Sequence, residues 1–229
     1  MSERCYKCFR PLSHCLCAYA TPVDSGVKFV LLMHPKEAKR ERTGTGHLAH
    51  ISLKGSEILV GLDFSQNARL HELLCNKQFL PVLLYPGNAA WTAKSAELAT
   101  ALGKNTQNAK TLLVLVIDAT WFCSRKVIEY SPFLLDLPRI SFSGSYRSEF
   151  TFKREPRPEY ISTIESCYYL IKELQDAKLV PSSVDASPLM AVFRKMVAAQ
   201  IQAQNDRIDG KLPNTHAYNW KYTKKFGES

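Results

Sequence analysis

The stretch from Thr111 to Lys126, TLLVLVIDATWFCSRK, decides the fold class of this chain. It opens with an unbroken apolar run, Leu112 to Ile117, in which no polar residue alternates with the apolar ones. Such a run predicts a strand that is buried on both faces of a parallel sheet, with helices packed on either side. We therefore expect an α/β fold with a mostly parallel sheet and helices on both faces.

A carboxylate, a hydroxyl and a large aromatic ring follow this predicted strand. Asp118 stands at its carboxyl end, and Thr120 is suited to cap a helix from Trp121 to Tyr130, before Ser131-Pro132. In open α/β sheets ligands bind at the carboxyl edge of the strands. The plainer alternative is a helix cap beside a core tryptophan. Other polar segments that point to the same edge favour a site.

Shorter apolar segments predict the rest of the sheet and its helices. Further strands are expected at residues 27–33, 56–62, 79–85 and 137–142. Helices are expected at 47–53, after a cap at Asp63 or Ser65, at 93–102, around Ser162 to Leu174, and at 188–204. This alternation of strands and helices is typical of a parallel α/β sheet.

Length and charge narrow the class of protein. The 229 residues, 45% of them hydrophobic, are enough for one domain with small appendages. The formal net charge of +9 favours a polyanionic partner such as RNA or DNA, although many soluble proteins are simply basic. No apolar run is long enough to cross a bilayer, and the start of the chain lacks the apolar segment of a secretion signal. We expect a cytoplasmic protein without a membrane partner.

Four of the seven cysteines form a cluster near the N-terminus, with the spacing C-x2-C-x6-C-x-C. The cluster consists of Cys5, Cys8, Cys15 and Cys17. In a cytosolic chain such a cluster indicates a metal more often than disulfides, and four thiolates are typical of structural Zn²⁺. Unligated thiols, or His14 in place of one cysteine, are the alternatives. We predict a zinc-binding segment over residues 1–25, a catalytic domain over 26–204 and a basic tail over 205–229.

Two basic segments follow predicted strand ends. The first begins at Lys36 and runs into Thr43-Gly44-Thr45-Gly46, where glycines let a backbone approach a ligand closely. The second, residues 143–159, interleaves basic and aromatic side chains, which suits a phosphate backbone with exposed bases. Each could also be an ordinary solvated surface. The residues expected to contact RNA are Lys36, Lys39, Arg40, Arg42, Arg147, Lys153 and Arg154.

The D-x-T-W element at Asp118 to Trp121 resembles the signature of the DTW-domain family. Other short segments match that family in the same order over nearly the whole chain. They are the cysteine cluster, His34-Pro35 with Glu37, Thr43 to Gly46, Leu84-Tyr85-Pro86-Gly87, Leu137-Pro138-Arg139, Tyr146-Arg147, and Arg157-Pro158 with Ser162 to Glu165. Gly44 departs from the pattern, because the family often has Asn there.

The resemblance implies a SPOUT-like, knotted fold and a tRNA-uridine aminocarboxypropyltransferase. Such enzymes transfer the 3-amino-3-carboxypropyl group of S-adenosylmethionine to N3 of a tRNA uridine and release methylthioadenosine. The catalytic residues would be Asp118, Thr120 and Trp121, with Asp118 as the general base. The donor would bind to Leu84, Tyr85, Pro86, Gly87, Arg157, Ser162 and Thr163, and Arg157 or Arg147 would hold its carboxylate.

Two other functions fit the same residues. A SPOUT-type RNA methyltransferase would use the same donor but transfer its methyl group. A non-catalytic RNA-binding zinc protein would bind RNA without binding the donor. The carboxylate of Asp118 argues against the second, because an acid near RNA phosphates is repelled and brings a pure RNA binder no advantage.

Overall fold

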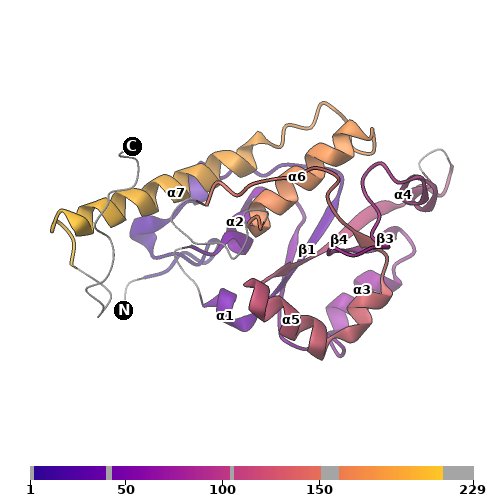
Figure 1. The fold of residues 1–229 in the computed structure, drawn as a ribbon, viewed down its shortest axis with the longest axis horizontal. Coiled ribbons are helices and arrows are strands. Elements are labelled where there is room, and N and C mark those ends of the chain that lie inside the picture. The colour runs from indigo at the N-terminus through magenta and orange to yellow at the C-terminus, as the bar shows by residue number, and fades with distance from the viewer. Residues whose placement is uncertain (1–2, 40–42, 104–105, 151–159, 214–229) are drawn as a thin grey trace.

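The computed structural model describes residues 3–39, 43–103, 106–150 and 160–213, and its centre is a five-stranded parallel sheet (Figure 1). The strands are β1 (Lys28–Met33), β2 (Glu57–Val60), β3 (Phe79–Leu84), β4 (Thr111–Asp118) and β5 (Arg139–Ile140). They lie in the order β2-β1-β4-β3-β5, and every neighbouring pair is parallel. The predicted α/β fold is confirmed, while the knot stays a prediction.

Strand β4 lies in the middle of the sheet and is buried on both faces, as its apolar run predicts. Val114 and Val116 belong to the core on one face, and Leu113 and Leu115 to the core on the other. Strand β1 ends level with β4, because Met33 pairs with Asp118 and the backbone N–H of His34 donates to the Asp118 carbonyl over 3.0 Å. The segments that follow both strands therefore start from the same sheet edge.

Helices cover both faces of the sheet (Figure 1). One core contains side chains of α2 (Thr45–Ser52), α4 (Ala96–Leu102), α6 (Thr163–Asp176) and α7 (Ser187–Ile208). The other contains side chains of α3 (Ala68–Cys75) and α5 (Trp121–Tyr130). Shorter pieces are α1 (Pro35–Ala38) and the 3₁₀ turns η1 (Leu12–His14), η2 (Cys17–Tyr19) and η3 (Pro132–Asp136). Within the described residues no helix is long and apolar enough to cross a membrane.

Some element boundaries differ from the sequence-based expectations. The cap of α3 is Asn67, whose side chain accepts from the Leu70 N–H over 2.9 Å, so the choice of Asp63 or Ser65 was wrong. Asp63 instead accepts from the Ser65 N–H in a turn that precedes the helix. Strand β5 is only two residues long, and α7 continues four residues beyond the expected end at 204.

Two buried glutamates on α6 hold the loop that follows β5. Glu165 closes a capping box with Ser162 and also accepts from the backbone N–H of Glu149 and the hydroxyl of Ser148. Two turns further along α6, Glu173 accepts from the N–H groups of Ser143 and Gly144 and from the Tyr146 hydroxyl. Because most of these donors are backbone groups, the two carboxylates determine the path of the loop.

Replacement of Glu165 by glutamine is expected to lower the free energy of unfolding by about 3 kcal/mol, because the amide nitrogen would face hydrogen-bond donors in a buried site. Chemical denaturation of the wild type and Glu165→Gln measures this difference. Glu97→Gln, an exposed change on α4, is the control and should alter stability little. Equal stability of both variants would mean that the loop path does not depend on Glu165.

Candidate active site

The carboxylate of Asp118 lies buried between β4, α2 and α6, with only 5% of the residue exposed. The hydroxyl of Thr163, at the start of α6, donates to Asp118 Oδ1 over 2.6 Å. Gly46, in the first turn of α2, lies against the same group: a Cβ at this position would fall 2.5 Å from Asp118 Cγ. Absence of a side chain at position 46 therefore makes room for the carboxylate.

Thr120 and Trp121 occupy the turn after this carboxylate. The Thr120 hydroxyl accepts from the Cys123 N–H over 3.3 Å, so the predicted cap of α5 is confirmed. The Trp121 ring lies near two tyrosines, with its centroid 6.3 Å from that of Tyr85 and 4.7 Å from that of Tyr160. Three aromatic rings from separate segments thus gather beside Asp118.

A cavity of about 700 Å³ opens at this sheet edge. Its lining includes eight residues that the sequence analysis assigned to the site: Leu84, Tyr85, Pro86, Asp118, Thr120, Trp121, Ser162 and Thr163. Gly87 is outside the lining; its backbone lies against Arg139, since a Cβ there would fall 2.5 Å from the Arg139 Nη1. Arg157 lies outside the described residues.

Sequence reasoning did not assign several residues that line the cavity, among them Glu37, Phe142 and Tyr160. Thr43 and Thr45 also line it, and they belong to the segment in which the sequence indicated a close approach to a ligand. Glu37 follows the end of β1, just as Asp118 ends β4. Because ligands bind at the carboxyl ends of parallel strands, its position after a strand could have identified it. Phe142 likewise follows β5. Tyr160 has no comparable signal, because it lies in an irregular segment ahead of α6.

The cavity is acidic and aromatic. Among the described residues that line it, Glu37 and Asp118 are the charged ones, and none is Lys, Arg or His. Both carboxylates are mostly buried, with 8% and 5% of the residue exposed. A cavity of this size, with two carboxylates and several aromatic rings in its wall, favours a small organic ligand.

The model of the DTW domain matches residues 2–201 of the chain. This chain belongs to the DTW-domain family. The match covers both the N-terminal cysteines and every described residue that lines the cavity, so the two features are parts of one DTW domain. No solved structure matches the chain.

The rim of the DTW-domain cavity carries basic and aromatic side chains. Phe122 on α5 is 69% exposed, and the Lys126 Nζ lies 5.5 Å from its ring centroid. Burial lowers the pKa of His34, and the charges of Lys36 and Lys126 lower it further, so both cations lie near the end of β1. Of the residues expected to contact RNA, Lys36, Lys39 and Arg147 are exposed, while Arg40, Arg42, Lys153 and Arg154 lie outside the described residues.

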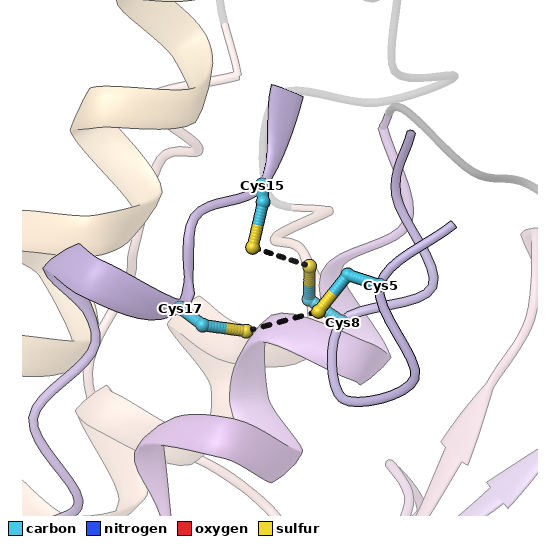
Figure 2. A group of neighbouring side chains, drawn as sticks. All are labelled: Cys5, Cys8, Cys15 and Cys17. Carbon is cyan, nitrogen blue, oxygen red and sulfur yellow. Dashed lines mark hydrogen bonds between the residues drawn. The ribbon is translucent and has the colours of Figure 1, made fainter. Parts of the chain in front are cut away.

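The four N-terminal cysteines of the DTW domain point toward one another and can hold a metal ion (Figure 2). Their sulfur atoms all lie within 4.8 Å of each other. The separations are 3.6 Å for Cys5 and Cys17 and 3.8 Å for Cys8 and Cys15. A tetrahedral ion with bonds of about 2.3 Å to sulfur requires sulfur separations of about 3.8 Å. The backbone N–H group of Cys8 lowers the pKa of Cys5 to about 6, whereas burial raises the pKa of Cys17.

The cysteine segment packs on α2 through an aromatic contact. Phe9 stacks on His47 with 4.5 Å between ring centroids, and both ring nitrogens of His47 are buried. Burial and the nearby charge of Arg10 lower the pKa of His47 to about 4. His47 is therefore neutral at pH 7 in the folded DTW domain.

Stability of the DTW domain is expected to fall as the pH is lowered from about 6.5 to about 4. Over this range an unfolded His47 binds a proton and the folded one does not, so acid favours unfolding, by up to about 3 kcal/mol. The measurement is the free energy of unfolding of wild type minus that of His47→Leu at each pH. This difference should decline toward low pH. A flat line for His47 would contradict the assigned shift.

Proposed function

We propose that the chain is an S-adenosylmethionine-dependent tRNA-uridine aminocarboxypropyltransferase. Membership of the DTW-domain family is consistent with a tRNA-modifying function. The observation that carries the finer proposal is the buried Asp118 carboxylate at the wall of a cavity of about 700 Å³, where the rings of Tyr85, Trp121 and Tyr160 lie close together. Transfer to a nucleobase needs a group that accepts the proton of the base and aromatic surfaces on which the base and the adenine of the donor can stack.

The cavity suits the donor in size and in its lining. Its volume lies in the range of small-molecule sites, and its wall combines polar groups with aromatic rings. Tyr85, Trp121 and Tyr160 offer faces for adenine and for uracil. Arg157 or Arg147 would hold the donor's carboxylate through a bidentate guanidinium contact; Arg147 directly follows Tyr146, which lines the cavity.

In the proposed reaction Asp118 removes the proton from uridine N3 as the nitrogen attacks. A bond forms between N3 and the methionyl carbon next to the sulfonium, and the bond from that carbon to sulfur breaks. The bonding electrons stay on sulfur, so neutral methylthioadenosine leaves and the proton ends on Asp118. The hydrogen bond from Thr163 holds the carboxylate in place, and alignment of the methionyl carbon with N3 selects this carbon over the methyl group.

The remaining parts of the proposal concern RNA, metal and location. Lys36, Lys39, Lys126 and Arg147 would contact tRNA phosphates, so affinity should fall as salt rises. The ion in the four-cysteine cluster would be Zn²⁺ with a structural role, because a complete thiolate set leaves no position for a substrate. Reduced cysteines and a tRNA substrate both fit the cytoplasm.

The decisive experiment is mass spectrometry of nucleosides from unmodified tRNA after incubation with the protein and S-adenosylmethionine. A uridine heavier by one aminocarboxypropyl group, absent when the donor is omitted, is the expected result. A uridine heavier by a methyl group would instead identify an RNA methyltransferase. Unchanged tRNA that still binds the protein would overturn both enzymatic proposals and leave an RNA-binding zinc protein.

A further inference from the structure

Arg10 is a buried guanidinium beside the four-cysteine cluster. Only 1% of the residue is exposed, and it is among the largest fully buried side chains of the described chain. Its Nη2 donates to the carbonyl of Gly44 over 2.9 Å and lies 3.4 Å from the sulfur of Met196 on α7. Within the described residues, Arg10 makes no ion pair with a carboxylate and its Nε has no partner.

A buried cation without a carboxylate needs another source of negative charge. The cysteine cluster is that source, since four thiolates outweigh one divalent cation and leave the metal centre negative. Arg10 Nη1 also donates to the carbonyl of Cys8 over 3.5 Å, so the guanidinium lies directly beside one of the four cysteines. The position of Arg10 is therefore electrostatically suited to a metal-bound cluster.

The other end of Arg10 reaches the cavity wall. Gly44, whose carbonyl accepts from Arg10, is the residue that precedes α2. Its neighbours Thr43 and Thr45 line the cavity, and Gly46 lies against the Asp118 carboxylate. One side chain thus connects the cysteine cluster with the segment that shapes one side of the cavity.

We infer that Arg10 is a positioning residue that couples metal binding by the four cysteines to the shape of the cavity. With metal bound, the negative cluster holds the guanidinium, and the guanidinium holds Gly44. Without metal the cysteine loop loses the bonds that fix Cys8, so Arg10 loses a fixed partner and the 43–46 segment loses its anchor. The part of this inference that concerns donor binding rests on the proposed function; the part that concerns metal retention does not.

The first measurement is the rate at which the full-length, zinc-loaded protein releases Zn²⁺ to a chromogenic chelator. Arg10→Met keeps the side-chain length and removes the charge, so release should be roughly tenfold or more faster, as for other changes around metal ligands. Lys7→Met, which removes an exposed cation between Cys5 and Cys8, is the matched control and should release Zn²⁺ at nearly the wild-type rate. Equal rates for the two variants would overturn the coupling.

The second measurement is hydrogen exchange at the amides of residues 43–47, with Zn²⁺ kept saturating. Arg10→Met should exchange faster there than Lys7→Met, and removal of Zn²⁺ from the wild type should produce the same change. Arg10→Lys retains the positive charge but lacks the two-pronged guanidinium that contacts both Cys8 and Gly44. It should therefore hold Zn²⁺ better than Arg10→Met, while hydrogen exchange at residues 43–47 stays fast. If Arg10→Met does not fold, Arg10→Lys takes its place. Zn²⁺ release and hydrogen exchange at wild-type rates in Arg10→Lys would then overturn the inference.

Binding of S-adenosylmethionine by calorimetry completes the test. Weaker binding to zinc-saturated Arg10→Met than to Lys7→Met would extend the coupling to the donor. If the wild type binds no donor while Zn²⁺ release and hydrogen exchange respond to Arg10, the proposed function fails and the coupling stands. If the wild type binds the donor and Arg10→Met behaves like the control in all three measurements, the coupling fails and the proposed function stands.

Discussion

Asp118→Asn is expected to lower the rate of transfer to tRNA by about 10²–10⁴-fold, the usual contribution of a positioned general base. Asparagine has the same shape, and its amide oxygen can still accept from Thr163 Oγ1, which lies 2.6 Å from the present carboxylate oxygen. The fold should therefore survive, and binding of S-adenosylmethionine should stay within a few-fold of wild type. Single-turnover transfer and calorimetry with the donor measure the two effects separately.

Glu129→Gln is the control variant. Glu129 is an exposed acid on α5, the helix that follows Asp118, and it does not line the cavity. Its replacement should change neither the rate of transfer nor the affinity for the donor. Loss of donor binding together with transfer in Asp118→Asn would indicate that Asp118 binds or supports the site and is not its base.

Gly46→Ala is expected to impair both stability and transfer, because the added methyl carbon would fall 2.5 Å from Asp118 Cγ and 2.9 Å from Oδ1. Overpacking of this kind costs about 1–3 kcal/mol in the free energy of unfolding. If the methyl group displaces the Asp118 carboxylate by about 1 Å, the rate of transfer should fall by about 10²-fold. Denaturation and single-turnover kinetics measure these two quantities.

The double variant Gly46→Ala with Asp118→Ala identifies the cause. Truncation of Asp118 removes the atoms that the new methyl would meet, so the double variant should be more stable than Gly46→Ala with Asp118 intact, while transfer stays lost. Gly61→Ala is the control, since a Cβ there meets the Phe64 ring, at 3.1 Å, and the Asp63 carbonyl, at 3.4 Å, but not the Asp118 carboxylate. If stability in the double variant does not recover, the damage comes from α2 itself and not from contact with Asp118.

Local sequence patterns were enough to predict the sheet and one side of the site. The apolar run of β4 predicted a doubly buried central strand, and the order of residues in it predicted where Asp118 and Trp121 lie. The turn after β3 reaches the same cavity for the same reason: parallel strands end at one edge. These features depend on residues within one strand and its following turn.

The other side of the site depends on contacts between distant segments, which no local pattern contains. The bond from Thr163 to Asp118 and the close approach of Gly46 to the same carboxylate both join separate elements. Ser162 and Thr163 entered the prediction only through the family resemblance. Arg10 gave no sign of burial, because an arginine in a short cysteine-rich segment has the composition of a surface residue.

The contact between Arg10 and Met196 also has a consequence for the order in which the molecule is made. The two residues are 186 positions apart, and Thr163 lies 45 positions after Asp118. During synthesis the cysteine segment emerges first, but the surface that receives Arg10 is complete only once α7 has been translated. A nascent chain that stops before α6 thus has the central strand and its carboxylate but neither Thr163 nor the closing helices. The complete cavity is accordingly absent from a fragment that ends before α6, because Thr163 and other residues of its lining have not yet been translated.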